Sequence, residues 1–200
     1  MNQIYRDDSV ALHTDRYQLN MGEVYWADGL HNRKAVFEVF FRKMPFGNGY
    51  AIFAGLERVV RFLQQFRFSD TDLAYLKEEG FDSGYLDFLR ELRFTGTVRS
   101  MREGELAFAG EPLMRIEAPL IQCQLIETAI LNIVNYQTLI ATKASRIKHI
   151  IVSDTALEFG TRRAQEMDAA VWGARAAVIG GFDGTANVRA GKMFGIPIAG

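Results

Sequence analysis

The 200-residue sequence contains one cysteine, four prolines and no long apolar run. A single cysteine excludes an intramolecular disulfide framework and a zinc site built from several cysteines, and it suits a reducing compartment. No stretch reaches the ~18 apolar residues that a membrane helix needs, and the start, MNQIYRDDSV, lacks the apolar segment of a signal peptide. We therefore expect a cytoplasmic protein in which Cys123 is a buried core thiol.

Neither sign of charge dominates, because 23 Lys and Arg face 24 Asp and Glu, for a formal net charge of −1. This balance gives no electrostatic support for nucleic acid or an anionic membrane as a partner, and we expect neither. The three histidines, His13, His31 and His149, lack metal-ligand spacing, so no metal site is expected within the chain. The 48% of hydrophobic residues excludes a disordered chain.

The first 118 residues indicate helices with a few strands. Capping residues and apolar periodicity predict four helices, which begin near Asp15, Leu56, Ser69 and Asp82. Residues 34–43, KAVFEVFFRK, predict a strand that is covered on both faces, and residues 44–51 predict a loop. Residues 96–118 alternate in short runs, which is typical of a small antiparallel β unit.

Pro119 opens a long apolar segment that predicts one helix or two consecutive helices. The last fifty residues then alternate between strands and helices, with strands expected in IIVSDTALEFG, VIGGFDG and IPIAG. The helix between the last two is expected to begin at Thr185 and to end at Gly195. This order predicts parallel β/α units. Since a closed α/β barrel takes about 250 residues, we expect the sequence to be truncated.

Two turns at expected strand ends carry residues suited to binding. The first, EFGTRRAQ, places Phe159 at a strand end and Arg162 and Arg163 in the following turn. Adjacent guanidinium groups offer planar, bidentate donors to a phosphate or a carboxylate. An ordinary solvated helix start is the alternative, but the helix dipole disfavours cations there by about 0.3–1 kcal/mol. A bound anion therefore explains the two arginines better.

The second turn is GGFDGTANVRAG, residues 180–191. Its glycines let the backbone approach a ligand closely, and a helix start near Thr185 directs free N–H groups to the same edge. Asp183 can bind a sugar hydroxyl or a magnesium-bound water, or simply cap the turn, and a purely structural turn is an equal alternative. Together the two turns favour a phosphate-bearing substrate, and thus a phospho-sugar or nucleotide enzyme of α/β-barrel type.

Six blocks of the sequence, in order, resemble the nicotinate phosphoribosyltransferase family: TDRYQLNMGEVYW, FEVFFRKMPFGNGYAIFAGLERVVRFL, EGELAFAGEPLMRIEAP, ETAILNIVNYQTLIATKASRI, EFGTRRAQ and GGFDGTANVRAG with FGIPIAG. The resemblance covers essentially the whole chain and implies the N-terminal portion of a longer one. It implies an α/β fold, with a mixed α/β N-terminal domain over residues 1–150. The first β/α units of an irregular, type II phosphoribosyltransferase α/β barrel would follow over residues 151–200.

The resemblance implies an enzyme of NAD salvage that joins nicotinate to the ribose of phosphoribosyl pyrophosphate, giving nicotinate mononucleotide and pyrophosphate. It further implies Mg²⁺, a homodimer, and ATP as a co-substrate whose hydrolysis is coupled through a transient phosphohistidine. That histidine is expected beyond Gly200, so we expect no catalytic residue within the chain and no activity of residues 1–200 alone. Nicotinamide or quinolinate phosphoribosyltransferase, and a truncated non-catalytic dimerisation module, are the alternatives.

Four aromatic and basic residues take roles by the same resemblance. Tyr17 matches the aromatic residue that stacks on the pyridine ring from the neighbouring subunit, and Phe159 would cover the opposite face of the ring. Arg162 matches the arginine that contacts the phosphate or carboxylate end of the ligand. Arg163 would support Arg162.

The second turn would contribute the remaining contacts. Asp183, Gly184 and Thr185 would line the ribose-phosphate side. Ala186 stands where the nicotinamide enzymes carry an aspartate and where family members often carry a serine. A carboxylate there would repel nicotinate, so a small neutral residue favours the acid over the amide as the substrate.

Overall fold

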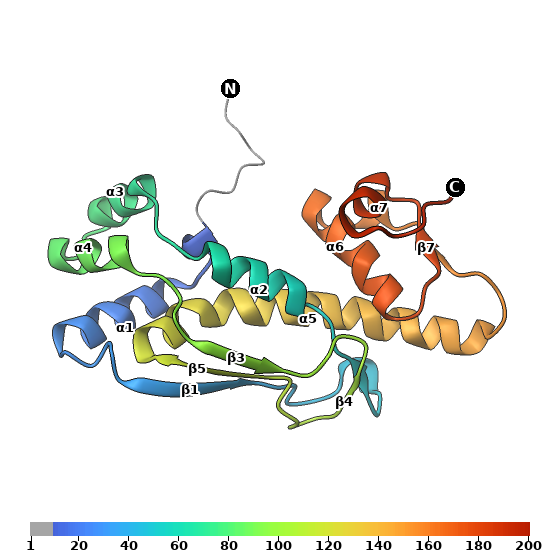
Figure 1. Ribbon diagram of the computed structural model, residues 1–200, viewed down its shortest axis with the longest axis horizontal. Helices are drawn as coiled ribbons and strands as arrows, with labels where there is room; N and C mark the ends of the chain where they lie inside the picture. Colours follow the sequence, from blue (N-terminus) through green and yellow to red (C-terminus); the bar gives the residue numbers. More distant parts are fainter. Residues whose placement is uncertain (1–9) are drawn as a thin grey trace. The chain divides into compact units, whose positions relative to one another are not determined.

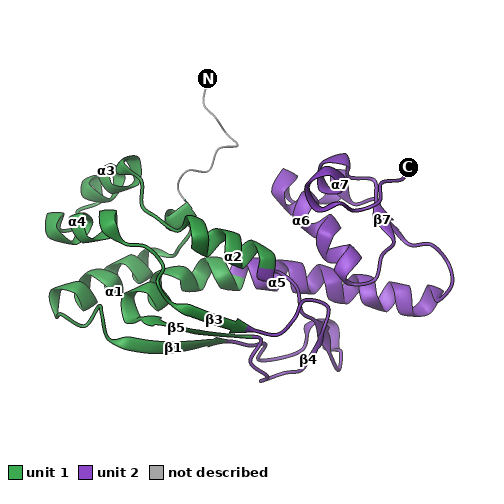
Figure 2. Ribbon diagram, viewed as in Figure 1, with its two compact units in different colours: residues 1–38, 57–99, 114–131 green, residues 39–56, 100–113, 132–200 purple. Residues whose placement is uncertain are grey.

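The computed structural model describes residues 10–200, which form two compact units (Figures 1 and 2). Unit 1 holds residues up to 38, residues 57–99 and residues 114–131. Unit 2 holds residues 39–56, 100–113 and 132–200. The chain passes between the units several times, and the long helix α5 (Leu120–Ile151) contributes to both. The expected domain boundary at residue 150 stays a prediction.

Unit 1 consists of helices and a three-stranded sheet of order β1-β5-β3. Its elements are the short turn η1 (Val10–Leu12), α1 (Arg16–Ala27), β1 (Lys34–Val39), α2 (Leu56–Gln65), α3 (Asp70–Glu78), α4 (Ser83–Glu91), β3 (Thr97–Ser100), β5 (Met114–Pro119) and the first turns of α5. In Figure 1 the helices of this unit lie on one side of the sheet. Buried aromatic and aliphatic side chains between them, such as Tyr85, Leu89 and Ile121, form the core.

Local capping explains where several of these helices begin. Ser69 and Asp72 form a capping box at α3, in which each side chain accepts a hydrogen bond from the backbone N–H of the other. Asp82 accepts from Gly84 N at 2.7 Å and so caps α4. Asp15 precedes α1, but its carboxylate accepts from Thr128 Oγ1 at 2.9 Å and makes no cap. The four expected helices are therefore confirmed, although one cap differs.

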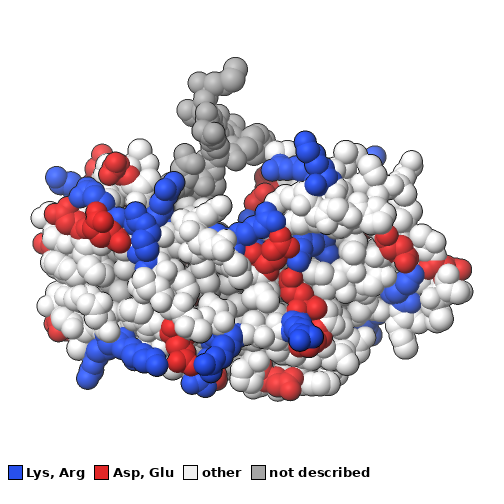
Figure 3. Space-filling model, viewed as in Figure 1, with Lys and Arg blue, Asp and Glu red and all other residues white. Residues whose placement is uncertain are grey.

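The expectation that the strand at residues 34–43 is covered on both faces is wrong. β1 ends at Val39, and alternate residues of it are exposed, with Val36 at 45%. The open face of the sheet carries ion pairs, including Lys34 Nζ to Glu117 Oε2 at 3.4 Å. Figure 3 likewise shows basic and acidic side chains interspersed over the visible surface. Because this face is charged and solvated, the strand follows the in-out alternation of an open sheet.

Unit 2 contains two further pairs of strands and a helical framework. Its elements are η2 (Pro45–Gly47), β2 (Ala51–Ile52), β4 (Leu106–Ala107), the later turns of α5, β6 (Leu157–Glu158), η3 (Thr161–Arg163), α6 (Glu166–Ile179), β7 (Gly184–Thr185) and α7 (Val188–Phe194). β2 pairs antiparallel with β4. The expected small β unit at residues 96–118 is thus divided: β4 joins β2, while β3 and β5 flank one another in the sheet of unit 1.

Threonines of α5 hold the segment of β2 against the helix. Thr142 Oγ1 accepts from Ile52 N at 2.9 Å, and Thr138 Oγ1 accepts from Ala54 N and donates to Ala54 O. Both threonines are fully buried, so these bonds satisfy backbone groups that the two-residue strand leaves open. The segment after Pro119 is one continuous helix, and of the two expected forms the single helix is correct.

Two of the three strands expected after α5 are present and parallel, each only two residues long, whereas IPIAG forms an isolated bridge and no strand. β6 pairs parallel with β7, and a parallel bridge joins Thr185 to Ile198. VIGGFDG was expected to contain a strand, whereas α6 runs to Ile179 and only two later residues are extended. Asn187, rather than Thr185, caps the next helix, and Gly195 ends it with a φ of 68°.

Two further expectations concern the core and the membrane. Cys123 is buried, as expected, and burial raises the pKa of its thiol. Among residues 10–200, no helix combines the length and the apolar character that crossing a membrane requires.

Candidate functional site

The candidate site lies where three consecutive parallel segments of unit 2 end. Glu158 pairs with Thr185 across β6 and β7, and Thr185 also bridges to Ile198. Backbone hydrogen bonds extend this order, with Ala186 N donating to Glu158 O at 2.9 Å and Ala199 N donating to Thr185 O at 3.1 Å. The residues that follow the three segments therefore share one edge. We call residues 158–163, 185–187 and 198–200 the strand-end rim.

Phe159 and Ala186 come together at this rim. A Cβ placed on Gly200 would lie 3.6 Å from Phe159 Cε1 and 3.8 Å from Ala186 Cβ, so both side chains border the same glycine. The Phe159 ring is 52% exposed, although large aromatic side chains are usually well covered. An exposed ring beside a small neutral side chain is suited to receive a flat ligand.

A buried hydrogen-bond network fixes the backbone of the rim. Thr185 is fully buried, and its Oγ1 donates to Glu158 Oε2 at 2.7 Å. The other carboxylate oxygen of Glu158 accepts from Gly160 N. Asn187 Nδ2 donates to Thr161 Oγ1 at 3.2 Å, which ties the two turns together a second time. Glu158 was not among the expected binding residues, although a carboxylate within a short apolar strand requires polar partners.

Both arginines of the first turn are exposed in η3, and no ion pair to either is found within residues 10–200. The dipole argument for them is wrong, because α6 begins only at Glu166 and carries Glu166 and Asp168 in its first turn. The arginines lie in η3, before this helix rather than in its first turn. Their availability to an anion rests instead on the lack of a carboxylate partner among the described residues.

A pocket of about 300 Å³ adjoins this turn. The side chains of Arg163 and Glu158 supply its charged groups, and alanines of α6 supply much of the apolar wall. Tyr136 also lines the pocket, and its hydroxyl donates to Ala169 O at 2.8 Å. Burial, reinforced by the nearby Glu158, raises the pKa of Tyr136, so this phenol remains protonated at neutral pH.

Asp183 is not brought to the rim. It precedes β7 and therefore lies at the opposite end of that strand from Ala186. Its Oδ2 accepts from Lys148 Nζ at 2.7 Å and from Ala156 N at 2.8 Å. The hydrogen bond from Lys148, followed by the one from Ala156, holds the pKa of Asp183 below its usual value. This carboxylate joins the end of α5 to the start of β6.

Of the two remaining expected site residues, Gly184 is buried and Tyr17 is exposed. Gly184 is buried within β7, and a Cβ there would meet Pro197 O at 2.7 Å, so the residue serves close strand packing. Tyr17 belongs to α1 in unit 1 and is 52% exposed. Gln18 Nε2 donates to the Tyr17 hydroxyl at 2.8 Å, and Gln18 itself is fully buried. Stacking between Tyr17 and a ligand on Phe159 stays a prediction.

Comparison with known proteins identifies the family. The model of the nicotinate phosphoribosyltransferase (NAPRTase) N-terminal domain matches residues 12–135. Nicotinate phosphoribosyltransferase of Bacillus subtilis (strain 168) is 64% identical over 98% of this chain and 40% of that protein. Nicotinate phosphoribosyltransferase 2 of Arabidopsis thaliana is 44% identical over 93% of this chain and 34% of that protein. The chain belongs to the nicotinate phosphoribosyltransferase family, and it spans well under half the length of these two relatives.

Solved structures agree with the fold. The crystal structure of human nicotinic acid phosphoribosyltransferase matches with a TM-score of 0.88 and 42% identity, over 94% of this chain and 38% of that one. Nicotinate-nucleotide pyrophosphorylase from Pyrococcus furiosus matches with a TM-score of 0.79 and 24% identity, over 100% of this chain and 45% of that one, which shows the fold alone. The expected fold class, a mixed α/β part followed by the first units of an α/β barrel, is confirmed.

Proposed function

We propose that the intact protein carrying this chain transfers the phosphoribosyl group of phosphoribosyl pyrophosphate to nicotinate, which yields nicotinate mononucleotide and pyrophosphate. The proposal rests on the strand-end rim, in a chain that belongs to the nicotinate phosphoribosyltransferase family. The ends of parallel strands there are bordered by an exposed aromatic ring, a small neutral residue and two arginines. Neither arginine has a carboxylate partner among the described residues. Ligands of α/β folds gather outside such strand ends.

The aromatic and basic residues have distinct roles in this proposal. The Phe159 ring stacks on one face of the pyridine, and the partner subunit of a homodimer supplies Tyr17 to the other face. Arg162 binds the phosphate or carboxylate end of the ligand, and Arg163 adds positive charge beside it. Positive charge builds on the ribose as pyrophosphate leaves, so the protein acts mainly by positioning its substrates and by stabilising charge.

Thr185, which the resemblance placed on the ribose-phosphate side, is fully buried. In this proposal it and Glu158 instead support the reaction without contacting substrate, because their hydrogen bond holds the turn that presents Ala186. Ala186 leaves room for the nicotinate carboxylate and does not repel it. Gly184 keeps the strands close enough for this arrangement. We do not place Asp183 in contact with substrate, since Lys148 and Ala156 already engage its carboxylate.

The proposal includes Mg²⁺, coupled hydrolysis of ATP through a histidine beyond Gly200, and a cytoplasmic role in NAD salvage. Within residues 10–200, no group of three His, Cys, Asp or Glu side chains is arranged to hold a metal. This part of the chain therefore does not supply a complete metal site. Mg²⁺ is commonly held in large part by substrate phosphates, which is how we expect it to enter here.

A substrate panel tests the proposal. The intact protein is incubated with phosphoribosyl pyrophosphate and nicotinate, nicotinamide or quinolinate, each with and without ATP, and products are measured by mass spectrometry. We expect nicotinate mononucleotide as the main product, with more of it when ATP is present. Preference for the amide or the diacid would favour the related phosphoribosyltransferases. Dimerisation without turnover of any substrate would favour a non-catalytic module.

A further inference from the structure

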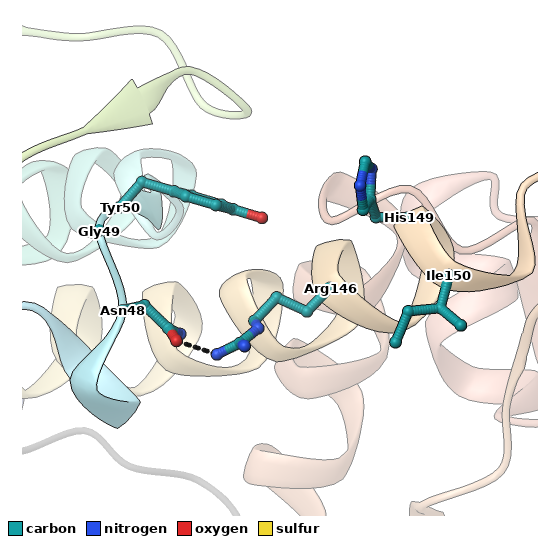
Figure 4. Close-up of a pocket in the computed structure, with 6 residues that line it drawn as sticks. All are labelled: Asn48, Gly49, Tyr50, Arg146, His149 and Ile150. Atoms are coloured by element: carbon teal, nitrogen blue, oxygen red, sulfur yellow. Dashed lines mark hydrogen bonds between the residues drawn. The ribbon is translucent and has the colours of Figure 1, made fainter.

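A second pocket lies within unit 2, between the loop that precedes β2 and the last turns of α5 (Figure 4). It has a volume of about 400 Å³, within the range of small-molecule sites. Its lining residues are Asn48, Gly49, Tyr50, Arg146, His149 and Ile150. None of these residues lines the pocket beside Arg163, so the two pockets are separate features of the unit.

The side chains around this pocket are mainly hydrogen-bond donors. Arg146 and His149 stand one helical turn apart on α5, and Figure 4 shows Arg146 reaching toward Asn48. The Tyr50 hydroxyl points across the pocket from the opposite wall (Figure 4). A guanidinium, an imidazole N–H, an amide NH₂ and a phenol thus come from two sides. No carboxylate is among the lining residues.

The amide of Asn48 has an unused donor. Arg146 Nη1 donates to Asn48 Oδ1, and this bond fixes the orientation of the amide, because a flipped amide would set two donors against each other. The Nδ2 atom is buried and has no acceptor within residues 10–200. A buried donor without an acceptor is unfavourable, so a ligand oxygen that reaches the Nδ2 atom would satisfy it.

The two segments that line the pocket carry charged side chains of one sign. Residues 39–56 contain two basic and no acidic residues, and residues 132–151 contain three Lys or Arg and no acidic residue. One of these cations, Lys148, is neutralised by Asp183. Lys143 lies one turn before Arg146 and places its Nζ 5.8 Å from the centre of the Phe46 ring, in the same loop as Asn48. These two segments therefore bring net positive charge to the pocket, which favours an anion.

We propose that this pocket binds a phosphate group, as a second anion site separate from the strand-end rim. A tetrahedral phosphate offers acceptor oxygens in several directions, which matches donors that lie on two walls better than a planar carboxylate does. Cations in the last turns of a helix often only offset its dipole. Arg146 differs, because its guanidinium is turned to Asn48 in the facing loop. The inference does not depend on the proposed transferase activity.

The test uses methyl NMR of the intact protein, with the Ile150 methyl as the reporter for this pocket and the Ile198 methyl as the reporter for the strand-end rim. Inorganic phosphate is titrated against sodium chloride of matched ionic strength. We expect a saturable shift of the Ile150 signal with phosphate and none with chloride. A parallel titration with ribose 5-phosphate distinguishes the sources: tighter binding identifies a phosphorylated metabolite, and equal binding identifies free phosphate.

Substitutions locate the binding. Arg146→Gln is expected to weaken the phosphate response at Ile150 at least about tenfold and to leave the Ile198 response unchanged. Arg67→Gln, which removes an exposed charge in unit 1, is the matched control and should leave both unchanged. If Arg146→Gln fails to fold, His149→Ala provides the same comparison. An Ile150 response that is absent, that chloride reproduces, or that survives both pocket substitutions overturns the proposal.

Discussion

Arg175 and Glu103 form a bidentate ion pair in unit 2, with Nη1 2.9 Å from Oε1 and Nη2 2.7 Å from Oε2. Each side chain is only 16% exposed. Glu103 Oε1 also accepts from Gly55 N at 2.6 Å and from Leu56 N at 3.1 Å. One carboxylate thus joins three segments of unit 2 that are far apart in the sequence: the loop after β3, residues 55 and 56, and α6.

Glu103→Ala is expected to lower the free energy of unfolding by about 3 kcal/mol, because it leaves the Arg175 guanidinium largely buried without this partner. Urea unfolding of the intact protein, followed by circular dichroism, measures the change. Arg61→Ala breaks an exposed pair with Glu57 and is the control, with an expected loss of at most about 1 kcal/mol. Equal losses for the two variants would contradict the importance of the buried pair.

The same carboxylate predicts a pH dependence. Burial by itself would raise the pKa of Glu103, but hydrogen bonds from Arg175 and from the Gly55 N–H outweigh burial and lower it below the usual 4.5. A lowered pKa contributes stability above the unfolded pKa and loses it as the pH falls through the folded value. The stability difference between wild type and Glu103→Gln should therefore shrink in acid. Unfolding between about pH 3 and pH 7 measures it, and a constant difference would refute the prediction.

Arg162→Gln is expected to reduce kcat/KM for nicotinate by about tenfold to a hundredfold, the value of one charge-assisted hydrogen bond. Because Arg162 is exposed, the melting temperature should not change. Steady-state kinetics of the intact protein measures the effect, and Arg163→Gln, with an expected smaller loss, is the neighbouring comparison. Full activity of Arg162→Gln would remove this residue from the proposed site.

Ala186→Asp is expected to lower kcat/KM for nicotinate by at least about tenfold, because a second carboxylate repels that of the substrate. The amide carries no charge, so kcat/KM for nicotinamide should fall much less. Ala186→Asn has nearly the same size without the charge and separates repulsion from crowding. Equal losses for both substrates in the Asp variant would show that size, not charge, governs this position.

Gly184→Ala is expected to destabilise the protein by about 1–3 kcal/mol. Its Cβ would lie 2.7 Å from the Pro197 carbonyl oxygen, a backbone atom that cannot rotate away. Gly49→Ala is the matched control, since nothing lies within 4 Å of a Cβ there, and it should be nearly neutral. Thermal unfolding compares the two, and a Gly184→Ala variant as stable as wild type would show that the strands can separate without cost.

Several features followed from the sequence because neighbouring residues determine them. Ser69 and Asp72 cap α3 within one turn of chain, and Gly195 ends α7 because glycine readily adopts a positive φ. The long helix after Pro119 and the parallel order of the last strands likewise follow from local periodicity and spacing. The family resemblance rested on six blocks of the sequence that include these segments, and the family is confirmed.

Other features depended on partners distant in the sequence. Asp183 has suitable chemistry for a ligand, yet Lys148 binds it at the far end of its strand. The sequence does not indicate a partner for Glu158, whereas in the structure Thr185 donates a hydrogen bond to its carboxylate. Local sequence determined where most helices lie, some of their ends and the residue types of the rim, since propensities act over a few residues. Only the tertiary structure decided which polar groups are already paired, because such pairing depends on which strands and helices meet.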